Sequence, residues 1–187
     1  MNALKRFWKN RKGNFSILFV TLVFVGVLVA TAFLDILFSS WSMQEIQSTM
    51  DVAGVSALRT GVDETKLRLE IFEVDKNVVE NSYKRMVSNF LDNSEKIIDY
   101  RYTRTKVDSY VENWGLGVSS KARPQAIIDS SMVITVEGSS LFDMVPGAAK
   151  VFYDSRSGSN FEVKYVERTQ DGDIQLAIRS VSRIVYR

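Results

Sequence analysis

The sequence contains no cysteine and no histidine in its 187 residues. Composition alone therefore excludes disulfide frameworks, thiolate nucleophiles, zinc sites built from cysteine and histidine, and Ser-His-Asp triads. No sign of charge dominates either, because 24 basic residues against 22 acidic ones leave a net charge of +2. That balance excludes a globally basic nucleic-acid-binding protein. We expect no nucleic acid among the partners.

Motifs that carry catalysis or metal binding are also missing. The sequence has no glycine-rich phosphate loop, no nucleophile elbow and no metal-ligand spacing. Residues 171–173 (DGD) lack the closing glutamate of a calcium loop, so a turn is favoured there. The carboxylates of Glu70, Glu73 and Asp75 are interspersed with lysine and arginine, as on a solvated helix face. We expect no enzyme, no metal and no cofactor; a hydrolase that uses paired carboxylates is the remaining alternative.

One long apolar run lies near the N-terminus. Residues 15–34 are 20 amino acids without a charge. As a helix this run would extend roughly 30 Å, which is about the thickness of the hydrocarbon layer of a bilayer. Trp8 and Trp41 lie on either side of it, where interfacial indoles are favoured. The run therefore predicts a single transmembrane helix.

The charges before this run predict its orientation. Five lysines and arginines and no acidic residue precede Gly13, and such a basic block favours the cytoplasmic side. We expect a basic cytoplasmic leader at residues 1–13, a transmembrane helix at 14–38 and an extracytoplasmic domain at 39–187, in a single-pass protein of the cell membrane. A cleaved signal peptide is the alternative, because residues 30–32 (ATA) have the composition of a cleavage site.

Asp35 is the one acidic residue inside the predicted transmembrane helix. A carboxylate that faces acyl chains costs about 3 kcal/mol at the centre of a bilayer and less at its surface. Two alternatives follow. Asp35 lies at the level of the headgroups and is hydrated, or it pairs with a cation on a neighbouring helix during assembly.

A narrow apolar stripe continues beyond the transmembrane helix. Its members recur at intervals of three and four residues, which is the spacing of a helix-packing stripe: Met43, Ile46, Met50, Ala53 and Ala57. Gly61 is the expected end of the helix. The stripe packs either on the domain of its own chain or against another subunit, and the sequence leaves both open.

The rest of the chain predicts one more amphipathic helix and then strands. Residues 79–91 place apolar side chains on one face, and the glycines, serines and proline of residues 113–125 predict a loop. Period-two alternation predicts strands, with a hairpin turn at Asp171-Gly172, at residues 98–102, 132–136, 151–153, 161–165 and 174–178. The expected fold class is α+β: a long N-terminal transmembrane helix continues into amphipathic helices that pack on an antiparallel sheet.

The order of these features resembles a known family. A basic leader ends in Arg11-Lys12-Gly13, an apolar span with Asp35 near its end follows, and an amphipathic helix then carries Gln47, Asp51, Ala53 and Gly54. Over about residues 8–60 this resembles the TadE/TadG-like pseudopilins of the tight-adherence (Flp, type IVc) pilus system. In that family the helix after the span has a similar spacing of glutamine, aspartate and small residues.

The resemblance implies a prepilin-type leader, cut after Gly13 by a dedicated membrane peptidase to leave Asn14 as the new N-terminus. It implies a minor pseudopilin or assembly component of a pilus or related secretion machine. Expected partners are the membrane, pilin or pseudopilin subunits, the pilus assembly platform and the prepilin peptidase. One position departs from the family: the fifth residue after the cut is usually glutamate, and here it is Leu18. The alternative is a single-pass scaffold or binding module of an envelope complex unrelated to pili.

Overall fold

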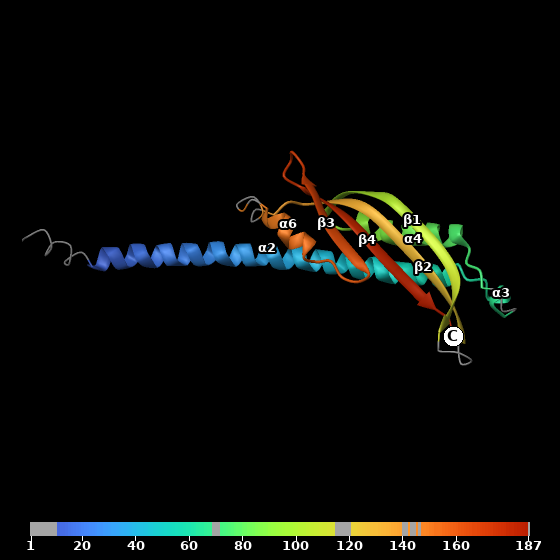
Figure 1. Ribbon diagram of the computed structural model, residues 1–187. Coiled ribbons are helices and arrows are strands. Elements are labelled where there is room, and N and C mark those ends of the chain that lie inside the picture. The colour runs from blue at the N-terminus through green and yellow to red at the C-terminus, as the bar shows by residue number, and fades with distance from the viewer. Residues whose placement is uncertain are drawn as a thin grey trace, which may run out of the picture. The chain divides into compact units, whose positions relative to one another are not determined.

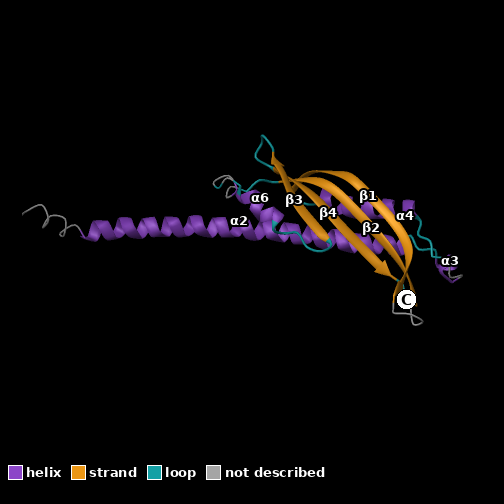
Figure 2. Cartoon of the chain, in the orientation of Figure 1, coloured by secondary structure: helices purple, strands orange, loops and turns teal. Residues whose placement is uncertain are grey.

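The computed structural model divides the chain into two compact units, Met1–Ser40 and Trp41–Arg187. The residues that the structure describes are 11–68, 72–114, 121–139, 142, 145 and 147–186. Among the described residues, the second unit contains a four-stranded sheet, the last 20 residues of a long helix, and three shorter helices. The α+β class expected from the sequence is confirmed, and Figures 1 and 2 show its elements.

Helix α2 (Arg11–Thr60) contributes residues to both units. In the first unit its apolar side chains are exposed; Ile17 is 68% exposed and Phe24 is 63% exposed. Among the described helices it is the one long and apolar enough to cross a membrane, a criterion that signal sequences also meet. The helix ends where predicted, since the N–H of Gly61 donates to the carbonyl of Ala57 at 3.1 Å and a turn follows.

Two helices follow α2 before the sheet begins. Helix α3 (Glu64–Arg68) is short, and helix α4 (Lys76–Asp92) is the predicted amphipathic helix. The side chain of Asp75 caps α4 by accepting bonds from the N–H groups of Asn77 and Val78, at 3.0 and 3.1 Å. The buried face of α4 is formed by Val79, Tyr83, Val87 and Leu91. The predicted apolar face is confirmed.

The sheet is antiparallel throughout, with the strand order β1-β2-β4-β3. Its strands are β1 (Ile97–Trp114), β2 (Lys121–Val136), β3 (Phe161–Arg168) and β4 (Ile174–Val185). The even-numbered residues 126–136 of β2 and 174–182 of β4 are buried, whereas most odd-numbered ones are partly or fully exposed. Helix α4 and the Trp41–Thr60 part of α2 lie on the face formed by the even-numbered residues (Figure 1). The core of the second unit lies between these helices and the sheet.

The strand predicted at residues 151–153 is wrong, because these residues belong to helix α6 (Ala148–Asp154). A helical turn sends Val151 to solvent, where it is 72% exposed, and buries Tyr153 to 2%. The ring centroids of Phe152 and Tyr153 lie 5.4 and 5.7 Å from the ring centroid of Phe142. An aromatic cluster formed with a distant residue thus overrides the local preference for a strand.

The predicted loop at residues 113–125 is also wrong at its ends, since β1 extends to Trp114 and β2 begins at Lys121. Residues 115–120 lie outside the described part of the chain. Pro124 is tolerated in β2 because it lies beside the end of β4, where its carbonyl accepts the N–H of Tyr186 at 2.9 Å. The hairpin turn between β3 and β4 is confirmed, with Gly172 in the left-handed region at a φ of 98°.

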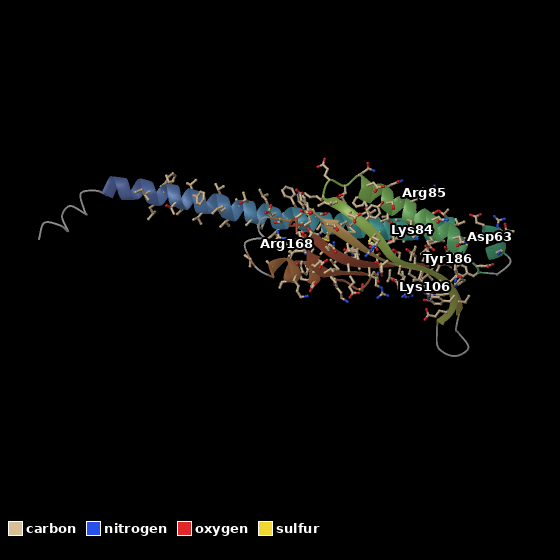
Figure 3. All side chains as sticks on the ribbon, turned by 90° about the horizontal axis from the view of Figure 1, so that it is seen from above. Asp63, Lys84, Arg85, Lys106, Arg168 and Tyr186 are labelled. Atoms are coloured by element: carbon tan, nitrogen blue, oxygen red, sulfur yellow. The ribbon has the colours of Figure 1, made fainter. Side chains whose placement is uncertain are left out.

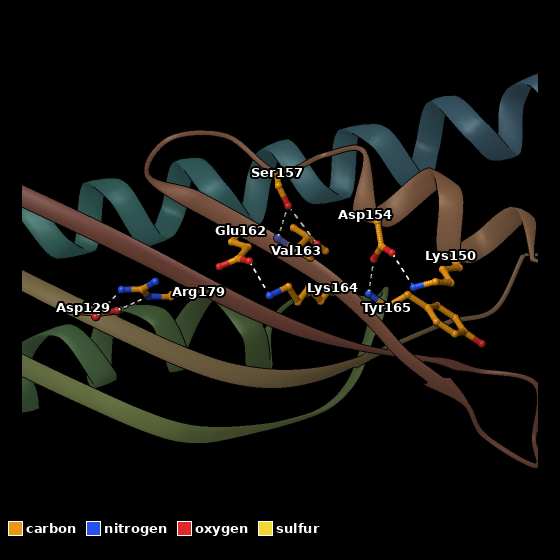
Figure 4. A network of polar contacts seen from close by, with 9 residues as sticks. All are labelled: Asp129, Lys150, Asp154, Ser157, Glu162, Val163, Lys164, Tyr165 and Arg179. Atoms are coloured by element: carbon orange, nitrogen blue, oxygen red, sulfur yellow. Dashed lines mark hydrogen bonds and ion pairs between the residues drawn. The ribbon is translucent and has the colours of Figure 1, made fainter.

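The outer edge of β3 is closed by side chains of the segment that precedes it. The hydroxyl of Ser157 accepts the N–H of Val163 at 3.0 Å and donates to the carbonyl of Val163 at 3.1 Å. The carboxylate of Asp154 accepts the N–H of Tyr165 at 2.8 Å (Figure 4). Both backbone groups of Val163 and the N–H of Tyr165, which would bind a further strand, are therefore already bonded within the chain.

Candidate functional site

All five residues of the predicted packing stripe are buried in the core of the Trp41–Arg187 unit. Their exposed fractions are at most 3%: Met43 3%, Ile46 1%, Met50 1%, Ala53 2% and Ala57 0%. The stripe is thus occupied by the sheet and helix α4 of the same chain. The opposite side of this part of α2 is exposed at Val52, whose exposed fraction is 63%.

The aspartate and glycine that carry the family resemblance both contact strand β4. The carboxylate of Asp51 accepts the hydroxyl of Ser180 at 3.4 Å. One turn further along α2, a side chain on Gly54 would overlap the side chain of Ser182 and stand 3.3 Å from Ile128. A glycine at this position therefore leaves room for the side chain of Ser182 against the backbone of α2. In this fold the motif holds α2 on the sheet.

A row of hydroxyl groups lies in the core beside Asp51. Thr105, Ser130 and Ser180 occupy opposed positions on β1, β2 and β4, on the face that the helices cover. Tyr83 of α4 is 1% exposed. Within the described residues, the buried hydroxyls of Thr105, Ser182 and Tyr186 have no hydrogen-bond partner, and those of Tyr83 and Ser130 have at most each other. The row makes the helix–sheet interface polar at its centre, which costs stability wherever a hydroxyl stays unbonded.

Burial changes the ionisation of two groups in this interface. Burial raises the pKa of Asp51 above its ordinary value, and the bond from Ser180 opposes that shift in part. Burial likewise raises the pKa of the Tyr83 phenol well above its usual range. Sequence reasoning missed this interface. The sequence did contain a sign of it. Ser130, Ser180 and Ser182 occupy even positions of β2 and β4, and the other even positions nearby are apolar.

The remaining predicted site residues lie in the first unit. Asp35 is half-buried within α2. Gly13 and Asn14 are part of the α2 backbone, and their side chains lie outside the description. Residues 1–10 of the predicted leader are likewise not described. Neither unit therefore brings Asp35, Gly13 and Asn14 together with the stripe into one site.

The open face of the sheet carries ion pairs. Arg179 donates two bonds of 2.9 Å to the carboxylate of Asp129, and this bidentate pairing lowers the pKa of Asp129. Lys164 lies 2.7 Å from Glu162 on β3 (Figure 4). Charges of both signs alternate over this face, as on a solvated sheet surface.

A polar pocket of about 610 Å³ lies at the turn between α2 and α4. Glu73 and Asp75, two of the carboxylates noted in the sequence, line it together with Lys66. Lys66 and Glu73, which both line the pocket, form an ion pair of 2.6 Å. Glu70 lies outside the described residues. No group of three or more acidic side chains in the described ranges could hold a metal ion.

Comparisons with protein-family models, with curated proteins and with solved structures find no match to this chain. Function is therefore inferred from its own residues.

Proposed function

We propose that the chain is a single-pass membrane protein and a minor pseudopilin or assembly component of a tight-adherence pilus or related secretion machine. The observation that carries the membrane anchor is the exposure of apolar side chains around the first part of α2; Leu18, Phe24 and Val29 are each more than 60% exposed. An apolar surface of this extent is unstable in water and needs lipid or a protein partner to cover it.

In the proposed mechanism the two parts of the chain have different roles. The apolar residues of α2 anchor the protein and pack against helices of other subunits, where the small residues Gly26, Ala30 and Ala32 allow close contact. The Trp41–Arg187 unit gives partner specificity. The stripe from Met43 to Ala57 is buried in that unit. Helix α2 therefore contributes its later residues to the core and its earlier apolar residues to the anchor.

The experiment that tests this proposal is the intact mass and N-terminal sequence of the protein recovered from its native membranes. A chain that starts at Asn14, and that keeps its leader when the prepilin peptidase is deleted, supports the pilin pathway. A start at Met1 contradicts processing. A start at Phe33 contradicts the anchor altogether, because a signal peptidase would have released the second unit.

Leu18 favours a second candidate, a permanent membrane scaffold of an envelope complex. In the family that the sequence resembles, a glutamate at this position would bond the freed amine of a neighbouring subunit, and leucine cannot accept such a bond. Co-purification separates the two candidates. Pilin subunits and a secretion ATPase among the bound proteins support the first, and partners without a prepilin leader support the second.

A further inference from the structure

The open face of the sheet, opposite to helices α2 and α4, carries a group of basic side chains. Odd-numbered residues of β2 point to this face, and so do the residues directly opposed to them on β1 and β4. Five basic residues occupy such opposed positions and are called the basic patch: Arg101, Arg104 and Lys106 on β1, and Arg179 and Arg183 on β4. Figure 3 shows Lys106 on the side of the sheet away from Arg85 of α4.

The basic patch forms two rows with strand β2 between them. Neighbouring strands lie roughly 4.8 Å apart, so the backbone of the β1 row is about 10 Å from that of the β4 row. The side chains of β2 between the rows are all shorter than arginine: Ile127, Asp129, Ser131 and Val133. The cations therefore stand on both sides of a strip of shorter side chains.

The carboxylates among these cations are already in ion pairs. Arg179 holds Asp129 through two bonds of 2.9 Å (Figure 4). Arg179 lowers the pKa of Asp129 most, and the charges of Arg104 and Lys106 add to that shift, so three cations surround one carboxylate. The other acidic groups beside the patch are paired with lysines: Asp108 with Lys106, and Glu162 with Lys164.

Three arginines of the patch are left without a carboxylate. Arg101, Arg104 and Arg183 are exposed, and within the part of the chain that the structure describes none of them forms a hydrogen bond or an ion pair. A guanidinium binds a carboxylate through two parallel bonds, as Arg179 does on the same face. The patch therefore carries an excess of positive charge, and its electrostatic complement is a group of carboxylates.

We propose that the basic patch is the docking surface for an extended acidic segment of another protein, whose carboxylates bind Arg101, Arg104 and Arg183. An extended chain directs successive side chains to opposite sides, so a segment that lies along β2 reaches both rows. Carboxylates are favoured over the backbone of a nucleic acid, because Asp108 and Asp129 would repel a continuous row of phosphates. The carboxylates of a protein can be spaced to avoid them.

One end of the open face limits where the acidic segment binds. Asp99 of β1 and Glu167 of β3 lie in the same row across the sheet, and neither has an ion pair among the described residues. They repel acidic groups, so the acidic part of the partner lies between Arg101 and Arg183. This surface gives the Trp41–Arg187 unit a partner chemistry, and it does not depend on whether the chain belongs to a pilus.

Binding of a fluorescent oligoglutamate to the full-length chain in a neutral detergent tests the surface. Oligoglutamine of the same length is the uncharged control, and fluorescence anisotropy measures both affinities. We expect the glutamate peptide to bind more tightly, and salt to weaken its binding. Arg101→Gln, Arg104→Gln and Arg183→Gln should each weaken it by about two- to fivefold, since each removes one exposed charged contact. Equal affinities for the two peptides would overturn the proposal.

Arg85→Gln is the matched control for these variants. Arg85 is an exposed arginine of α4 without a hydrogen bond or ion pair in the described ranges, and its replacement changes the net charge equally. The basic residues before Gly13 are common to all variants, so they do not contribute to the differences. A loss in Arg85→Gln as large as in Arg104→Gln would overturn the site. Circular dichroism checks that each variant keeps its fold.

A single-stranded oligothymidylate of the same charge separates a protein partner from a nucleic acid. We expect it to bind the wild type more weakly than oligoglutamate does. Tighter binding that is lost in Arg101→Gln, Arg104→Gln and Arg183→Gln would assign the patch to nucleic acid and overturn the proposal. The N-terminal sequence of the native protein, which tests the pilin pathway, is a separate measurement, so failure of either idea is recognised independently.

Discussion

Gly54 of α2 lies against Ser182 of β4 so closely that the structure has no room for a methyl group between them. The contact fixes the separation of helix and sheet at the middle of the core. Met50 and Ala57, one turn before and one turn after it, are both buried to 1% or less exposed. The apolar stripe of α2 is therefore buried on both sides of this close contact.

Gly54→Ala should destabilise the second unit by about 1–3 kcal/mol, because the added carbon forces α2 away from β4. Thermal unfolding of the full chain in detergent, followed by circular dichroism, measures the loss. Gly26→Ala is the matched control on the same helix, since a side chain there meets nothing within 4 Å. Equal melting temperatures for the two variants would contradict the close contact.

Asp51→Asn should flatten the pH dependence of stability just above pH 3.8, the ordinary pKa of an aspartate. Burial raises the pKa of Asp51 in the folded chain, so ionisation favours the unfolded chain. The wild type therefore loses stability as the pH rises from 3.8 through the raised value, and the asparagine variant does not. Above that window the variant should be at least as stable as the wild type.

Asp129→Asn is the control, because the ionisation of Asp129 changes stability with pH in the opposite direction. Its bonds with Arg179 lower the pKa of Asp129, so the ionised carboxylate stabilises the folded chain above the ordinary pKa. That contribution is lost as the pH falls through the lowered value. Denaturant midpoints measured across the acidic range compare the two variants. A loss of stability at neutral pH in Asp51→Asn would contradict the account of Asp51.

Tyr83→Phe should leave stability nearly unchanged. The phenol oxygen is buried and has at most the Ser130 hydroxyl as a partner among the described residues, so removing it costs at most one weak hydrogen bond. Leu91→Ala, on the same buried face of α4, should cost about 2–5 kcal/mol through the cavity it leaves. Chemical denaturation measures both. A cost for Tyr83→Phe near that of Leu91→Ala would show that the hydroxyl is bonded.

The apolar periodicities of the sequence were sufficient for most of the elements. The stripe from Met43 to Ala57, the buried face of α4 and the alternation in β4 were visible as repeated intervals, because each element buries one face continuously. The end of α2 at Gly61 and the turn at Asp171-Gly172 had local signals of glycine and aspartate.

Features that depend on distant residues could not be predicted in this way. Residues 151–153 form a helix because Phe152 and Tyr153 reach Phe142. Pro124 is a strand residue because β4 ends beside it. The hydroxyl row depends on the register of three strands, which a single sequence does not reveal. The closure of β3 likewise depends on the fold of the loop before it.

Ser157→Ala and Asp154→Ala should open the edge of β3. Each removes the acceptor of one amide, so exchange of the Val163 and Tyr165 amides with deuterium should accelerate about fivefold, as expected for a bond worth about 1 kcal/mol. Hydrogen exchange read by NMR measures each amide separately. The amide of Val181, bonded to the carbonyl of Asn160, is the internal control. Unchanged rates at Val163 and Tyr165 would contradict the closed edge.

The membrane anchor is the central claim, and labelling of one introduced cysteine tests it most directly. Lys164→Cys replaces a side chain that is 68% exposed in the second unit, and the chain has no other thiol. A maleimide that cannot cross membranes should label this variant in intact spheroplasts, and the labelled chain should stay with the membranes after an alkaline wash. Labelling that requires lysis, or a labelled chain in the soluble fraction, would contradict an anchored protein with its second unit outside the cytoplasm.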